Sequence, residues 1–292
     1  MNDFTDADRQ RAGHRSTLVS VAVNLFLSII QFFIGIFAQS QALVADSIHS
    51  LSDLVSDGAV LLANKHSMKE PDADHPYGHR RFETAAAMAV GALLLSVGIG
   101  MLWRSFTSLQ NPQAIPEVHY AALIIAAITL VAKELLFRYL LLVGEKFRST
   151  MLVANAWHSR SDAASSLVVV VGIGANMMGF HLADPLAALI VGLMIVRMGW
   201  KFFFASFNDL MDSAVDSDTE ERIRQHLLST PGVEGIHALR TRKLGDMIWV
   251  EVDLEMNGNL TIAQGHAIAT EARKRVMDNE AVLDVTTHFD PV

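Results

Sequence analysis

Two pairs of residues combine an imidazole and a carboxylate at a spacing suited to metal binding. His49 precedes Asp53 by four positions, and His158 precedes Asp162 by four positions. Residues four apart lie on one face of a helix, so each pair can offer one nitrogen and one oxygen to a shared ion. Two such faces supply the four ligands of a tetrahedral Zn²⁺, and the two carboxylates neutralise its charge. The alternative is two intrahelical hydrogen bonds that only help helices to pack.

The composition restricts the ligand chemistry and the class of protein. The chain has no cysteine, which excludes disulfides and thiolate metal sites. Hydrophobic residues make up 51%, charged residues only 18%, and the mean hydropathy is +0.31, which indicates a membrane protein. A net charge of −8 argues against nucleic acid as a partner. The chain shows no nucleophile elbow, P-loop, HExxH or dinucleotide fingerprint, so we do not expect an enzyme.

Apolar stretches long enough to cross a membrane recur along residues 16–206. The first begins at 16 and ends at a turn around 39–41. The others cover about 42–64, 84–103, 119–142, 157–179 and 184–206. We therefore predict six transmembrane helices. Both imidazole–carboxylate pairs fall inside them, where ionisable residues are costly and mark functional sites.

Other ionisable residues in these stretches have simpler interpretations. Glu134 and Arg138 are four apart, which predicts a structural ion pair within one helix. Asp46 lies one turn before His49. It either orients that imidazole from behind or stands near the membrane interface at the start of its helix.

The distribution of charged residues along the chain indicates its domain boundaries and its orientation across the membrane. Lys and Arg gather in the N-terminal arm and in the loops after the second and fourth spans, which places both termini in the cytoplasm. Residues 211–292 hold 8 basic and 15 acidic residues, unlike the balanced part before them. We expect a cytoplasmic N-terminal arm at 1–15, a membrane domain at 16–208 and a cytoplasmic metal-binding domain at 209–292.

The acidic tail has the pattern of a small folded domain. Residues 247–256 alternate apolar and polar side chains, as a half-buried strand does. Helices are predicted at 218–229 and 261–277, with further strands at 235–242 and 282–288. The order αββαβ is typical of a two-layer α+β sandwich.

Three segments together resemble the cation diffusion facilitator family. They are ADSIHSLSD at 45–53, NAWHSRSD at 155–162 and DLMD at 209–212. The resemblance covers nearly the whole chain. It implies an α-helical membrane protein of six transmembrane helices followed by a cytoplasmic ferredoxin-like α+β domain. It also implies a homodimer that exchanges divalent cations for protons, with a transport site formed by His49, Asp53, His158 and Asp162. Histidine at position 49 favours zinc.

The loop after the second span holds a second candidate site. Asp72, His75 and His79 are spaced so that they can converge on one ion, and the resemblance implies an accessory metal site there. The alternative is a polar loop with incidental histidines. The resemblance also implies a salt bridge between Arg81 and Asp212 that locks the dimer.

The tail holds a third candidate site. The resemblance places a binuclear cytoplasmic site on His237, Asp253, His266, His288 and Asp290. Asp253 stands where some relatives have histidine, which bears on how many ions are bound. The alternative is an acidic domain with surface histidines.

The expected function is export of Zn²⁺ from the cytoplasm by proton antiport through a His₂Asp₂ intramembrane site. The expected location is the bacterial inner membrane. Zinc would also serve as a structural or regulatory ion, because cations that bridge two acidic tails remove their repulsion. The alternatives are a Mn²⁺ or Fe²⁺ exporter of the same family, or a non-transporting membrane metal sensor or scaffold.

Overall fold

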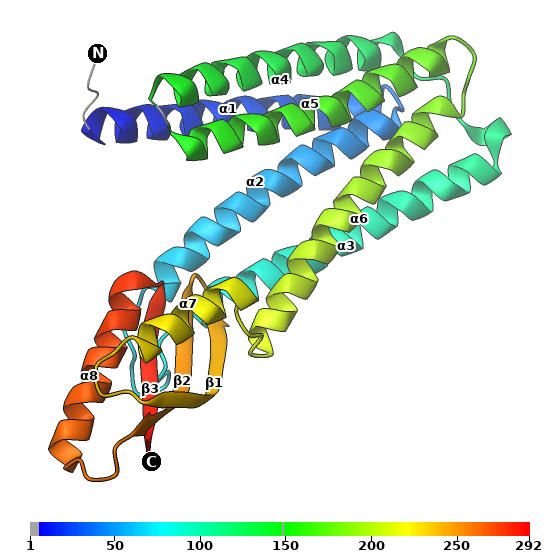
Figure 1. Cartoon of the computed structure of the whole chain (residues 1–292). Coiled ribbons are helices and arrows are strands. Elements are labelled where there is room, and N and C mark those ends of the chain that lie inside the picture. Colours follow the sequence, from blue (N-terminus) through cyan, green and yellow to red (C-terminus); the bar gives the residue numbers. More distant parts are fainter. Residues whose placement is uncertain (1–5, 148) are drawn as a thin grey trace. The chain divides into compact units, whose positions relative to one another are not determined.

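The computed structural model describes the backbone of residues 6–147 and 149–292, and their side chains except at 6–12, 57, 60–62, 64–65, 114 and 150–151 (Figure 1). Residues 1–5 of the expected N-terminal arm therefore lie outside the description. The chain divides into two compact units. One comprises residues 1–58 and 90–200, and the other comprises residues 59–89 and 201–292.

Long helices occupy every stretch expected to cross the membrane. They are α1 (Asp6–Phe37), α2 (Gln41–Ser67), α3 (Arg81–Gln110), α4 (Tyr120–Lys146), α5 (Thr150–Met177) and α6 (Ala183–Leu210). A short 3₁₀ turn, η1 (Pro112–Ala114), lies between α3 and α4. Helix α1 begins at Asp6, so the described part of the arm continues directly into the first span. Glu134 and Arg138 form the predicted ion pair, with Nε and Oε1 2.8 Å apart.

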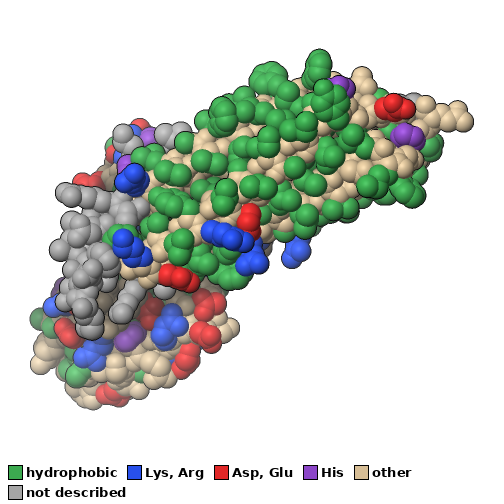
Figure 2. Space-filling model, turned by 90° about the horizontal axis from the view of Figure 1, so that it is seen from above, with side chains coloured by type: hydrophobic (Ala, Val, Ile, Leu, Met, Phe, Trp, Pro, Cys, Tyr) green, Lys and Arg blue, Asp and Glu red, His purple; other side chains and the backbone are tan. Residues whose placement is uncertain are grey.

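Hydropathy separates these helices into two kinds. Among the described residues, α1, α3, α4 and α6 contain segments long and apolar enough to cross a membrane. Helices α2 and α5 are not in that set, and they are the two that carry the imidazole–carboxylate pairs. Hydrophobic side chains are spread along the helical surface seen in Figure 2. A membrane supplies the solvent that such a surface requires.

Glycines let α3 and α6 approach each other closely. A Cβ atom on Gly199 would lie 2.8 Å from the backbone nitrogen of Leu95, and one on Gly98 would lie 2.7 Å from Cγ2 of Val196. Small residues at such crossings are how membrane helices gain packing without a hydrophobic driving force.

The start of α6 is joined to the start of α2 by hydrogen bonds. The carboxylate of Asp184 accepts from the hydroxyl of Ser40 at 2.5 Å and from the backbone N–H of Gln41 at 2.7 Å. The first N–H groups of a helix lack partners within it and carry partial positive charge. Asp184 therefore acts as a capping group for α2, although it belongs to another helix.

The tail has the predicted αββαβ order: α7 (Ser217–Leu228), β1 (Gly235–Leu244), β2 (Met247–Met256), α8 (Ile262–Asn279) and β3 (Val282–Pro291). Strand β2 is central, antiparallel to β1 and parallel to β3. The alternating residues Val250, Val252, Leu254 and Met256 pack with α7 and α8 in one core. Both helices thus cover the same face of the sheet, and the polar residues of β2 face the other side.

Candidate metal sites

Helices α2 and α5 bring three of the four expected transport ligands together. Ligand atoms of His49, Asp53 and Asp162 all lie within 4.8 Å of one another. His49 is only 6% exposed, and the two carboxylates are half-buried. Each helix contributes from one face, as the spacing of four residues requires.

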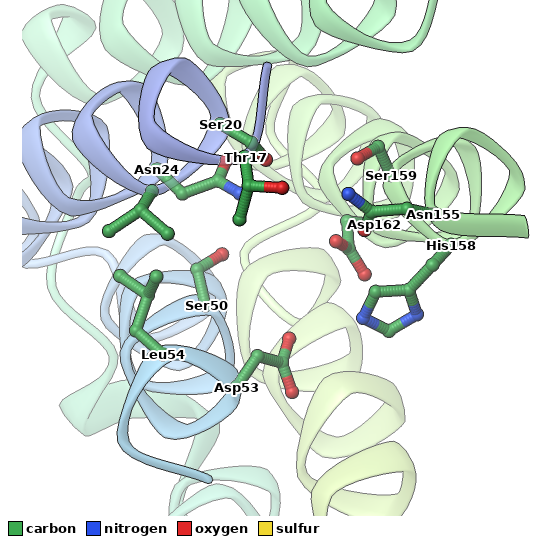
Figure 3. Close-up of a pocket in the computed structure, with 11 residues that line it drawn as sticks. Thr17, Ser20, Asn24, Ser50, Asp53, Leu54, Asn155, His158, Ser159 and Asp162 are labelled. Carbon is green, nitrogen blue, oxygen red and sulfur yellow. The ribbon is translucent and has the colours of Figure 1, made fainter. Parts of the chain in front are cut away.

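The fourth expected ligand, His158, lines the same pocket of about 70 Å³ as Asp53 and Asp162. Figure 3 shows Asp53 reaching from α2 toward Asp162 and His158 on α5. Helix α1 lines the pocket with Thr17, Ser20, Val21 and Asn24. Ser50, Leu54, Asn155 and Ser159 complete the wall. We call the space bounded by these residues the transport pocket, after the site that the resemblance implies.

The pocket has the chemistry of a divalent cation site. Nδ1 of His49 lies 3.9 Å from Oδ2 of Asp53, beyond hydrogen-bond distance. That buried nitrogen has no hydrogen-bond partner among the described residues. Buried polar atoms are nearly always paired, so an unpaired imidazole nitrogen beside two carboxylates suits an added ion. The nitrogen and oxygen donors match those that bind zinc and other transition metals.

The loop between α2 and α3 brings its three expected ligands into one group, since ligand atoms of Asp72, His75 and His79 also lie within 4.8 Å of one another. Asp72 faces Nδ1 of His75 at 3.3 Å and Nε2 of His79 at 3.4 Å. The pKa of Asp72 is lowered, chiefly because its carboxylate accepts the backbone N–H of His75 at 2.7 Å. The loop thus holds an ionised carboxylate between two imidazoles.

Another histidine stands beside this loop, although we did not predict it from the sequence. The ring of His66, near the end of α2, lies 5.6 Å from the ring of His79. The centroid of the Phe82 ring lies 4.9 Å from that of His66 and 5.7 Å from that of His79. The position of His66 only nine residues before His75 was the available signal.

In the tail, strand pairing gathers a third group on the face away from α7 and α8. His237 pairs with Asp253, and Asp253 pairs with His288 on the other side. Nε2 of His237 lies 2.9 Å from Asp290 and 3.7 Å from Asp253. Ligand atoms of His237, Asp253 and Asp290 all lie within 4.8 Å of one another. His288 approaches the group through Asp290, at 3.6 Å.

Two residues of the tail depart from the expected ligand set. His266 is exposed on α8, which packs on the opposite face of the sheet, and the group just described does not include it. Glu255 comes within 3.0 Å of Nδ1 of His237, so a third carboxylate joins this imidazole. The alternation of β2 places Glu255 beside Asp253 on one face, which was the signal for it in the sequence.

Arg81 and Asp212 form the expected ion pair, here within one chain. Arg81 begins α3, and Asp212 follows the end of α6. Asp212 has a φ of 59°, a left-handed conformation that Asp tolerates better than most residues. A neighbouring pair, Arg80 with Asp246, is 2.7 Å apart and joins the same loop to the tail domain.

The sequence also matches known proteins along nearly its full length. Residues 17–211 match the cation efflux transmembrane domain, and residues 215–292 match the cytoplasmic domain of cation efflux proteins. Metal tolerance protein C1 of Arabidopsis thaliana is 33% identical over 96% of this chain, which spans only 62% of that relative's length. Manganese efflux system protein MneP of Bacillus subtilis is 31% identical over 98% of both chains.

Among solved structures, the metal-bound C-terminal domain of the CzcD transporter from Thermotoga maritima is 28% identical over 25% of this chain and 87% of that one, with a TM-score of 0.25. The two family matches cover the membrane helices and the tail, and the tail match is to the family's dimerisation domain. Proteins of this family are transporters rather than enzymes. The chain therefore belongs to the cation diffusion facilitator family, as a membrane transporter of divalent cations.

Proposed function

We propose that this transporter exports Zn²⁺ from the cytoplasm in exchange for protons. The observation that carries the proposal is the transport pocket, where His49, Asp53 and Asp162 lie within 4.8 Å of one another and His158 lines the same wall. Two nitrogens and two oxygens are a common donor set for tetrahedral zinc. Among divalent ions, zinc also binds such donors more tightly than manganese or iron.

The same donors couple metal to protons. A metal-binding imidazole must be neutral and a metal-binding carboxylate must be ionised, so binding of the cation releases protons. A more acidic medium on the far side of the membrane protonates the ligands and expels the metal. Histidine suits this role because its ordinary titration lies near physiological pH.

The remaining expectations complete the proposal. Both termini face the cytoplasm, and the membrane is the bacterial inner membrane. The loop group of Asp72, His75 and His79 is an accessory cation site. The tail group around His237 binds regulatory zinc. The pair Arg81 and Asp212 fixes the ends of α3 and α6 at the dimer interface.

Manganese is the second candidate ion, because a relative matched over 98% of both chains is named a manganese efflux system protein. Carboxylate oxygens such as those of Asp53 and Asp162 suit Mn²⁺. The oxygen-rich tail group, with Asp253, Glu255 and Asp290 around one imidazole, also suits a harder ion.

The decisive experiment is metal flux in proteoliposomes under an imposed pH gradient, with Zn²⁺ and Mn²⁺ in competition. We expect gradient-driven Zn²⁺ flux that Asp162→Asn abolishes. Flux of Mn²⁺ that Zn²⁺ does not inhibit would reassign the ion. Equal flux with and without Asp162→Asn would overturn the assignment of the pocket, and flux independent of the gradient would overturn the antiport.

A further inference from the structure

A buried ion pair lies beside the transport pocket and belongs to none of the metal groups. Lys133 on α4 is 2% exposed, and Asp46 on α2 is fully buried. The ammonium lies 3.5 Å from Oδ2 of Asp46. It also donates to the hydroxyls of Ser166 at 2.8 Å and Ser50 at 3.0 Å.

The carboxylate of Asp46 is bonded as fully as the ammonium. It accepts from the amide of Gln31 on α1 at 2.8 Å and from Ser166 on α5 at 2.7 Å. Ser165 on α5 donates to its other oxygen at 3.2 Å. One network of two opposite charges therefore ties α1, α2, α4 and α5 together.

The network lies next to the transport pocket, on the side of Ser50. Asp46 precedes His49 toward the start of α2, and Ser165 follows Asp162 toward the end of α5. On α5 the pocket is lined from Asp162 back to Asn155, toward the start of that helix. Ser50 belongs to both, since it lines the pocket and accepts from Lys133.

This position gives the ion pair an electrostatic role. Lys133 cancels the charge of Asp46. Among the described residues that line the pocket, the negative charges are then those of Asp53 and Asp162, which one divalent cation neutralises. A lone buried charge beside the pocket would act strongly on the cation, because the surroundings screen it poorly.

We propose that Lys133 is a positioning residue, the built-in counter-ion of Asp46. It sets the charge of the transport pocket to match one divalent cation. The proposal rests on transport through this pocket. It differs from an ordinary packing role in predicting that loss of either charge shifts cation affinity in a direction set by the sign of the charge that remains.

The test compares Lys133→Met, Asp46→Asn and the double variant in proteoliposomes, with whichever of Zn²⁺ and Mn²⁺ the unaltered protein carries. Lys133→Met leaves an extra negative charge, so KM should fall about tenfold and kcat should fall because release slows. Asp46→Asn leaves an extra positive charge, so KM should rise about tenfold. The double variant should return KM to within about twofold of the original, and Lys133→Arg should retain it.

Shifts of KM in the same direction in both single variants would overturn the proposal, as would unchanged KM with lower kcat. If neither single variant is recovered folded, the double variant decides, because no lone charge remains in it. A KM like that of the unaltered protein supports the proposal, and a KM changed tenfold overturns it. Asp162→Asn, measured alongside, separates this result from failure of the proposed transport site.

Discussion

The transport pocket and the tail group are both made of histidine and carboxylate, yet they differ in what surrounds them. His49 is 6% exposed, and the ion pair of Asp46 and Lys133 beside the pocket is buried. His237 in the tail has a side chain that is 50% exposed, with Asp253, Glu255 and Asp290 around it. Charges in the membrane must be balanced group by group, whereas water and salt screen those in the tail. The pocket therefore suits one divalent cation, whose charge matches that of the two carboxylates. The tail group suits cations that bind or leave as their concentration changes.

The largest expected effect comes from matched substitutions in the two groups. Asp53→Asn should reduce metal flux by about 100-fold or more, because a buried ligand set loses one of two compensating charges. Asp253→Asn should reduce it by less than about threefold, since its charge is screened. Flux assays on both variants make the comparison. Similar losses in the two would contradict it.

A second test removes packing from the tail and leaves the pocket intact. Leu254 is fully buried in the tail core, so Leu254→Ala should lower the unfolding free energy of that domain by about 2–5 kcal/mol. Hydrogen exchange along β2 measures the change. Flux should fall far less than in Asp53→Asn. Unchanged hydrogen exchange in β2 would contradict the predicted loss of stability. Flux abolished as in Asp53→Asn would show that the pocket depends on the tail.

Salt should also distinguish the groups. Raising KCl from about 0.1 to 1 M shortens the screening length from about 10 to 3 Å. Cation affinity of the tail should weaken by about tenfold, because its carboxylates are exposed, while KM for flux should change by less than about twofold. Calorimetry on the full chain with Asp162→Asn and Asp72→Asn, which remove a ligand from the pocket and from the loop group, isolates the tail. Equal salt dependence of the two measurements would remove the distinction.

A smaller effect is expected at the start of α8. Thr261 caps this helix in a reciprocal capping box with Gln264. Thr261→Ala should cost the tail about 1 kcal/mol of unfolding free energy. Thr270→Ala, which removes a hydroxyl from the body of the same helix, is the matched control. Urea unfolding followed by tail fluorescence compares them, and equal midpoints would show that the cap contributes little.

The smallest effect concerns acid. The pKa of Asp216 lies below its ordinary value of 3.8, chiefly because the carboxylate accepts the backbone N–H of Thr219 at the start of α7. Its stabilisation is thus complete above that ordinary value and is lost as pH falls through the lower, folded value. Between about pH 5 and 3 the tail should lose stability less steeply in Asp216→Asn than in the unaltered chain. Thermal unfolding at several pH values measures the two slopes, and parallel slopes would exclude the contribution.

Much of the fold followed from pattern. Apolar length predicted every long helix, and the spacing of His49 with Asp53 and His158 with Asp162 identified the polar faces of α2 and α5. Alternation along 247–256 predicted the central strand of the tail. These signals act within one element, where the helix or strand period fixes which residues share a face.

Contacts between elements were harder to foresee. Lys133 and Asp46 are 87 positions apart, and no period links residues on different helices. Both residues are charged and lie inside predicted spans. Because an unpaired charge in a membrane is costly, the two could have been predicted to pair. The resemblance grouped His266 with His237, but sheet pairing and the packing of α8 place them on opposite faces. A ligand list by itself carries no information about which face of a sheet a helix covers.

The cap that Asp184 places on α2 has a mechanical consequence. It fastens the first turn of α6 to the start of α2, through hydrogen bonds to Ser40 and Gln41. A helix of 28 residues is about 42 Å long at 1.5 Å per residue. A tilt of about 10° around the cap therefore displaces its other end by about 7 Å. A small change in the hydrogen bonds of Asp184 therefore corresponds to a movement at the other end of α6 that is larger than the transported ion.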